Sequence, residues 1–172
     1  RENGIRYLAA DMSRPEGLPA AQNTGNRPAI DAWVPLFKRW ATSIYYNTKT
    51  TKLGADGSLP DEYNYFYGPG GLFKLNGQDW YSKAQTWAQI LDRESDNLLI
   101  YMLRGEIYPV MFHQSNMIRY SGDSSLYSEL VDATFAKFTA VTSLPVLSLS
   151  HSDVGKAMEA RMAVNAAQVS AT

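Results

Sequence analysis

Residues 108–117 read YPVMFHQSNM, a short apolar run that ends in His113, Gln114, Ser115 and Asn116. The run predicts a buried strand over residues 107–112 that carries polar side chains at its carboxyl end. In α/β proteins active sites gather at the carboxyl ends of parallel strands, because the loops there face a crevice. His113, one of two histidines in the chain, is therefore the first candidate catalytic residue.

The segments around this stretch predict alternating helices and strands. Strands are expected over 5–10, 42–47 and 144–149, and helices over 78–91, 96–103, 123–141 and from 150 onward. From residue 78 the order helix, strand, helix, strand, helix favours parallel strands covered by helices. The predicted fold class is α/β, either a barrel or an open sheet.

Two of these helices carry a clear apolar face. Over 78–91, Trp80, Trp87 and Leu91 share the spacing of one buried helical stripe. In the last helix, Val154, Met158 and Met162 do the same. We expect both sets to lie in the core.

The composition is that of a globular domain. The chain has 172 residues, 45% of them hydrophobic, and a formal net charge of -1. It has no basic block, which argues against nucleic acid and anionic membrane surfaces as partners. No apolar run approaches the roughly 20 residues of a membrane-spanning helix. With no cysteine, thiolate catalysis, disulfides and cysteine-ligated zinc are excluded.

Each candidate site residue has a functional and a structural interpretation. His113 is either a general acid or base, the usual role of imidazole near neutral pH, or a histidine that hydrogen-bonds a neighbour. Gln114, Ser115 and Asn116 either bind a polar ligand or cap the next turn. Arg14 follows the strand expected over 5–10, where it either clamps a carboxylate in bidentate fashion or forms a surface ion pair.

Three tyrosines, Tyr63, Tyr65 and Tyr67, are spaced by two residues. In an extended conformation they lie on one face, which makes them either a sugar-stacking platform or a core-packed edge with the hydroxyls outward. The second histidine, His151, is best read as part of a helix cap. The two histidines form no His-x3-His pair, so the sequence predicts no metal site within the chain.

Several short motifs, taken in order, resemble the later half of secreted microbial exopolysaccharide deacetylases. They are residues 4–7, 13–16, 42–47, 61–65 and 111–116. The chain is most similar to the galactosaminogalactan deacetylase group, carbohydrate esterase family eighteen, within the NodB-type polysaccharide deacetylases. The resemblance spans most of the 172 residues and implies that residues 1–172 are the C-terminal part of one catalytic domain, built as a distorted (β/α) barrel.

The resemblance also implies roles for particular residues. His113 is the catalytic acid, and Arg14 orients the catalytic base. The chain would also supply part of the substrate groove, and the residues expected to bind the substrate there are Gln114, Asn116, Tyr63 and Tyr65. The resemblance further implies a substrate that is a polymer of N-acetylhexosamine, with N-acetylgalactosamine the first choice, and an enzyme that is secreted or extracellular, with the periplasm as the alternative.

The metal-binding motifs of that family are absent from this sequence. The resemblance therefore implies a divalent metal, zinc by first choice, whose ligands lie outside this chain. The partner would be the N-terminal half of the catalytic domain, in the same polypeptide or in a separate chain. The rival hypotheses are a non-catalytic carbohydrate-binding module on the tyrosine-rich segment and a structural or interaction domain. The residues that precede Arg1 would separate these hypotheses.

Overall fold

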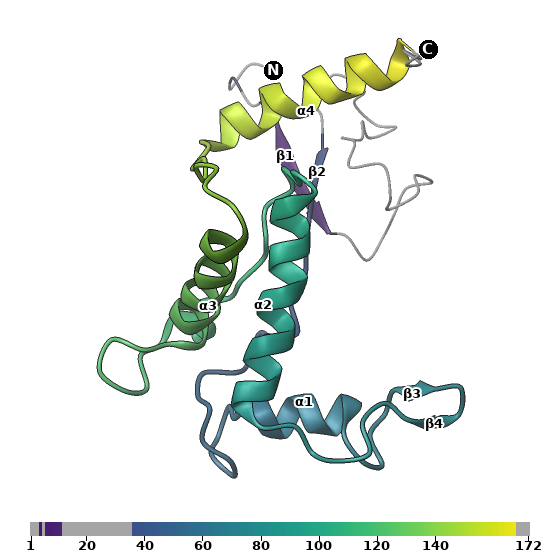
Figure 1. The fold of residues 1–172 in the computed structure, drawn as a ribbon, viewed down its shortest axis with the longest axis vertical. Helices are drawn as coiled ribbons and strands as arrows, with labels where there is room; N and C mark the ends of the chain where they lie inside the picture. Colours follow the sequence, from purple (N-terminus) through teal and green to yellow (C-terminus); the bar gives the residue numbers. More distant parts are fainter. Residues whose placement is uncertain (1–3, 5, 12–35, 168–172) are drawn as a thin grey trace. The chain divides into compact units, whose positions relative to one another are not determined.

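The computed structural model describes residues 4, 6–11 and 36–167, which form two compact units (Figure 1). One unit contains the described parts of 1–41, 105–111 and 144–172, and the other contains 42–104 and 112–143. The elements in chain order are β1 (Leu8–Asp11), β2 (Leu36–Arg39), α1 (Leu59–Tyr67), β3 (Lys74–Leu75), β4 (Gln78–Asp79), α2 (Trp87–Leu103), η2 (Gln114–Met117), α3 (Leu126–Val141) and α4 (His151–Ala166).

The first unit holds the parallel strands. β1 pairs with β2 in parallel, with Leu8 opposite Leu36. Trp40 then forms a single parallel bridge to Val110, with Trp40 N donating to Pro109 O at 2.9 Å and Met111 N donating to Trp40 O at 2.8 Å. The strand predicted over 107–112 is therefore reduced to one bridge. The α/β class is confirmed, and the described residues do not form a closed barrel.

Helix α4 covers the core of this unit. Met158 is fully buried with Tyr7 and Tyr108, and Val154 and Met162 pack against them, so the predicted inner face is confirmed. Gly155 makes this packing possible, because a Cβ there would lie 2.5 Å from the Tyr7 ring.

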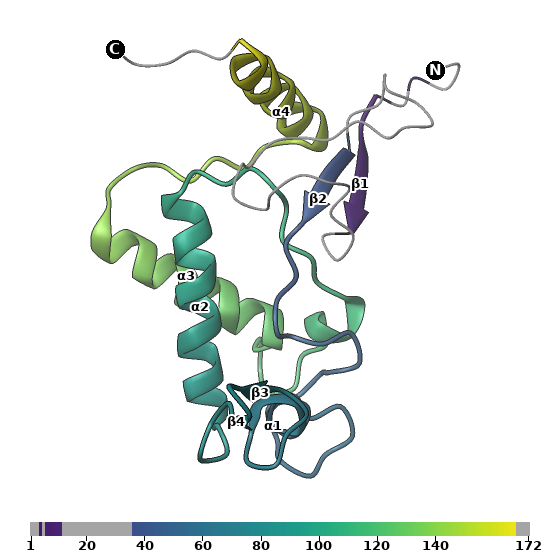
Figure 2. The ribbon, with the colours of Figure 1, turned by 90° about the vertical axis from the view of Figure 1, so that its right-hand side faces the viewer.

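The second unit is built on helices α2 and α3, which pack against each other (Figure 2). α3 begins after Ser125, whose hydroxyl accepts from Ser128 N at 3.1 Å, and ends at Val141, as the sequence predicts. The buried apolar residues of the two helices are Ile90, Leu98, Leu126, Leu130 and Phe138. Burial of each such side chain contributes about 1.5–3 kcal/mol.

Polar contacts fix how α2 meets α3. Trp87 Nε1 donates to Glu129 Oε2 at 2.6 Å. Lys137 Nζ lies 2.7 Å from Asp92 Oδ1 and 2.6 Å from Asp96 Oδ1.

No helix in the described ranges is both long and apolar enough to cross a bilayer.

Helix α2 begins later than predicted, at Trp87 instead of residue 78. Thr86 and Gln89 form a capping box, which sets the helix start. Gln78 instead lies in β4, which pairs with β3 around Asn76 and Gly77, both with positive φ. Such a pair of residues favours a tight hairpin turn. The prediction that Trp80 lies on a buried helical face is therefore wrong, since Trp80 follows the hairpin and is exposed.

The tyrosine-rich segment is helical, which corrects the extended conformation predicted for it. Ser58 caps α1, Pro60 occupies its first turn, and Gly68 ends it. On a helix Tyr63 and Tyr67 share a face, and their rings lie 4.9 Å apart. Tyr63 is only 2% exposed, so it belongs to the core and cannot stack on a sugar.

Two other predicted strands are not strands in the structure. Residues 42–47 contain bends and a turn, and residues 144–149 have no regular structure and exposed side chains. A strand needs a neighbour for its backbone groups. Within the described residues, the Tyr45 and Thr48 carbonyls instead accept hydrogen bonds from the side chain of Asn116.

The buried tyrosines predict a loss of stability in alkali. Burial raises the pKa of the Tyr45 and Tyr63 hydroxyls above the ordinary value of 10.0. Above about pH 10 the unfolded chain ionises these groups while the folded chain keeps their protons, so the free energy of unfolding falls as pH rises. In urea unfolding curves, Tyr63→Phe is expected to make this decline less steep. If the free energy of unfolding declined just as steeply with pH in that variant, the raised pKa of Tyr63 would be contradicted.

Candidate active site

His113 lies in the second unit, directly before the short helix η2, in an extended backbone conformation. Its backbone N donates to Asn116 Oδ1 at 2.9 Å, and its carbonyl accepts from Asn116 N at 3.0 Å. The imidazole is half-buried. The backbone at His113 is therefore fixed without use of the side chain, which leaves the imidazole available for chemistry.

Asn116 holds the loop over residues 42–48, which lies beside His113. Its side chain is 0% exposed. Its amide nitrogen donates to Tyr45 O at 2.8 Å and to Thr48 O at 2.9 Å. Because the amide is buried and already bonded on both sides, the geometry supports a positioning role for Asn116 and not the substrate contact that was predicted.

The 42–48 segment supplies an aromatic neighbour for His113. Ser115 Oγ donates to Tyr46 O, and the Tyr46 ring meets the imidazole edge-on with centroids 6.1 Å apart. Tyr46 is 71% exposed. At the other end of the segment Ser43 N donates to buried Glu94 Oε2 at 3.0 Å. These contacts hold a histidine and an exposed aromatic ring side by side at the surface of the unit.

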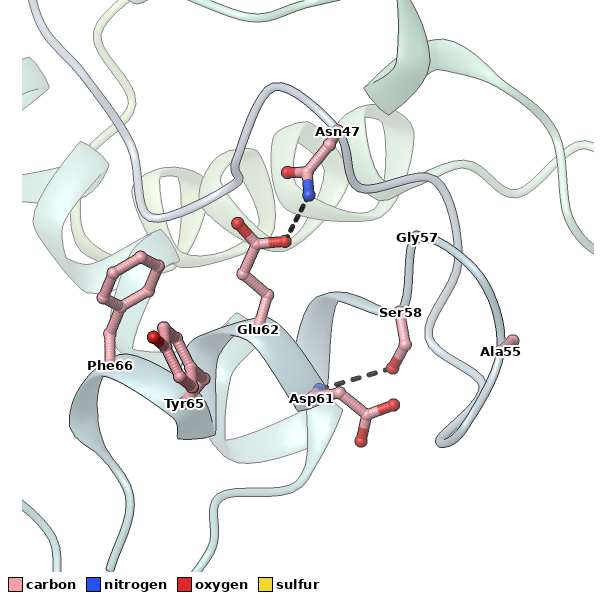
Figure 3. A pocket seen from close by; sticks show the side chains of 8 residues that line it. All are labelled: Asn47, Ala55, Gly57, Ser58, Asp61, Glu62, Tyr65 and Phe66. Atoms are coloured by element: carbon pink, nitrogen blue, oxygen red, sulfur yellow. Dashed lines mark hydrogen bonds between the residues drawn. The ribbon is translucent and has the colours of Figure 1, made fainter. Parts of the chain in front are cut away.

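A pocket of about 410 Å³ adjoins the same segment (Figure 3). Its lining residues are Asn47, Ala55, Gly57, Ser58, Asp61, Glu62, Tyr65 and Phe66. Asn47 directly follows Tyr46 in the chain, and its amide points toward α1, donating to Glu62 Oε2 at 2.6 Å (Figure 3). Amide and carboxylate groups beside an aromatic wall suit a ligand that carries hydroxyl and acetamido groups.

The predicted site residues fall into three groups. Gln114 is exposed beside His113, and Tyr65 is exposed on the pocket wall. Tyr63 and Asn116 are buried. Arg14 lies outside the described residues.

Asn47 and Glu62 line the pocket but were not predicted as site residues from the sequence. Each belonged to a motif that carried the family resemblance, but nothing local indicated that the two side chains meet across fifteen positions of the chain. Once α1 is known to be a helix, Glu62 and Tyr65 are three residues apart and share a face. That helical face is the signal that would have located the pocket.

A metal centre is not assembled by the described residues. Among 4, 6–11 and 36–167, no group of three or more histidine, aspartate or glutamate side chains is placed to hold an ion. The donor set that the described part of the chain presents therefore does not fit a resident divalent metal.

Comparison with known proteins places the chain in a family. No curated protein sequence matches it. A solved structure described as Agd3, a novel carbohydrate deacetylase, has a similar fold, with a TM-score of 0.70 at 20% sequence identity. That match covers 94% of this chain and 24% of the solved one, so this chain spans less than a quarter of its relative's length. The family model for the Agd3 deacetylase domain matches residues 1–172. The chain belongs to the Agd3 deacetylase domain family.

Proposed function

We propose that this chain is the C-terminal part of a single catalytic domain of a polysaccharide N-deacetylase, and that His113 is its general acid. The observation that carries the proposal is the setting of His113. It is held by its backbone before η2, has a half-buried imidazole, and lies against an exposed tyrosine. Membership of the Agd3 deacetylase domain family supports the reaction class.

Hydrolysis of an N-acetyl group requires a general acid beside the leaving nitrogen. In hydrolysis of an N-acetyl group, water adds to the carbonyl carbon, the C–N bond breaks, and acetate and a free amine form. An amine is a poor leaving group unless its nitrogen receives a proton as the bond breaks. His113 donates that proton. The base that accepts the proton of the attacking water lies outside the described residues, and Arg14 is proposed to orient it.

The pocket on α1 would bind the sugar. Gln114 and Tyr65, both exposed, are proposed substrate contacts, with Asn47 and Glu62 as further polar partners. The substrate class is an exopolysaccharide of N-acetylhexosamine, N-acetylgalactosamine by first choice, and the enzyme would act outside the cell. Since every pocket-lining group is an amide, carboxylate, hydroxyl or aromatic ring, apart from small Ala55 and Gly57, the lining matches a neutral acetylated sugar.

A divalent metal, zinc by first choice, is proposed to be ligated by residues outside this chain, in the N-terminal half of the domain. Such an ion would supply Lewis-acid chemistry for the hydrolysis. The roles proposed for the described residues do not depend on it, because they concern proton donation and sugar binding.

The proposal is tested by the release of acetate from an N-acetylated hexosamine polymer by the intact protein. We expect release that stops on treatment with a chelator and returns when zinc is added. Binding of the polymer without any release of acetate would instead support a non-catalytic carbohydrate-binding module. Absence of both binding and release would favour a structural or interaction domain.

A further inference from the structure

A row of aromatic rings runs from the pocket into the β3–β4 hairpin. Tyr65 and Phe66 line the pocket, with their centroids 5.3 Å apart. Phe66 stacks on Phe73 at 5.4 Å and 19°. Tyr67 contacts Phe73 at 5.2 Å and Trp80 at 5.8 Å. The five rings form one continuous series of contacts, which we call the aromatic row.

The outer members of the aromatic row are open to solvent. Tyr65 is 61% exposed, Phe73 46% and Trp80 41%. Phe66 and Tyr67 are partly buried beneath them. Large exposed aromatic side chains that cluster at one place mark a binding surface more often than single exposed residues do.

The hairpin is fixed to α1, so the exposed rings are held in place before any ligand binds. Leu72 N donates to Tyr65 O at 3.1 Å, Phe73 N to Phe66 O at 2.8 Å and Tyr81 N to Tyr67 O at 3.0 Å. An ion pair between Lys74 and Asp79 joins the two strands. A surface that is already ordered loses little conformational entropy on binding.

At the hairpin end of the aromatic row, two opposite charges are paired. The Lys74 amine holds the pKa of the Asp79 carboxyl below its usual range, and the ion pair between the two groups offsets their charges. The five rings of the aromatic row carry no formal charge. Flat rings beside paired polar groups suit the two sides of a pyranose, whose C–H face is apolar and whose edge carries hydroxyl groups.

We propose that the aromatic row, through Tyr65, Phe73 and Trp80, is a second carbohydrate-binding surface that takes pyranose units of a neutral polysaccharide beyond those in the pocket. This inference rests on the proposed function for the identity of the substrate. Continuity argues for the same ligand, because Tyr65 and Phe66 belong to both the pocket and the row. Binding energy from such remote sugar units would favour long polymers over short oligosaccharides.

The test compares three variants of the intact protein by their affinity for an N-acetylated hexosamine polymer. Trp80→Leu keeps an apolar side chain but removes the aromatic face, and should weaken binding about fivefold or more. Trp80→Phe keeps an aromatic face and should bind within about twofold of wild type. Leu75→Ala is the matched control, because Leu75 is exposed in the same hairpin outside the aromatic row, and its affinity should not change.

Two results would overturn the inference. The first is wild-type affinity in Trp80→Leu. The second is an equal loss in Leu75→Ala, which would mean a general apolar contact such as a protein interface. Acetate release from a short N-acetylated oligosaccharide keeps the two proposals apart. Leu75→Ala should release acetate at the wild-type rate, whereas no release from either protein would count against the deacetylase and leave the polymer affinities to be judged separately.

Discussion

Replacing His113 by alanine in the intact protein is expected to lower kcat for N-deacetylation by about 10²–10⁴-fold, the usual contribution of a positioned general acid. The fold should survive, because the hydrogen bonds that hold this position use the His113 backbone N and O and not the imidazole. Circular dichroism and polymer affinity should therefore match the wild type. A variant that keeps full turnover would remove His113 from the mechanism.

The leaving group offers a sharper test of what His113 does. In an activated aryl acetate ester the leaving group is an aryloxide, which departs as a stable anion and needs no proton. The His113→Ala variant should therefore hydrolyse such an ester almost as fast as the wild type. An equal loss on the amide and on the ester would show that His113 has a different role. His151→Ala is the matched control, since His151 is the other histidine of the chain, exposed at the start of α4. Its turnover should be unchanged.

Replacing Asn116 by alanine is expected to destabilise the loop around His113 by about 2 kcal/mol or more. The substitution leaves two backbone groups, His113 N and Thr48 O, without a partner, and a buried polar group without a partner costs about 1–3 kcal/mol. Tyr45 O loses one of its hydrogen bonds but still accepts from Thr48 N and Thr48 Oγ1. Hydrogen exchange over residues 42–50 reports this local opening directly. Exchange there should accelerate about 100-fold, which corresponds to about 2.8 kcal/mol.

Gln114→Ala is the control for Asn116. Gln114 lies in the same short helix but is exposed, so the change in stability should stay within about 0.5 kcal/mol. Equal exchange rates in the wild type and Asn116→Ala would show that the loop does not depend on Asn116. Together the substitutions separate two roles. His113→Ala should lose turnover while the loop over residues 42–50 keeps its structure. Asn116→Ala should lose turnover because that loop opens.

The sequence predicted the elements whose signals lie within a few residues of each other. α3 and α4 occur where the cap residues and apolar spacing placed them, with Ser125 at one start and Met158 on the buried face. Capping and helical spacing depend on contacts between residues three or four apart. For the same reason the capping box at Thr86, had it been weighed against the apolar spacing of Trp80, would have placed the start of α2 correctly.

The spacing of tyrosines at every second residue was a weaker signal of local structure. Tyr63, Tyr65 and Tyr67 fit an extended strand by spacing, but Ser58, Pro60 and the acidic residues that follow are a helix start. The helix prevailed, because Tyr63 could then pack in the core while Tyr65 faced the pocket. Because of this error, Tyr63 was predicted to contact the substrate although it lies in the interior, and the pocket-lining Glu62 was not predicted.

By itself the sequence determined the α/β class, the helices α3 and α4, the family and the choice of His113 as the residue to test. Only the tertiary structure decided that residues 42–48 form a loop around Asn116, that Asn47 meets Glu62, and that an aromatic row reaches the hairpin. The physical reason is the range of the interactions. Caps and apolar stripes are satisfied locally, whereas the Asn116 amide bonds carbonyls 68 and 71 positions away, and such partners are known only once the chain has folded.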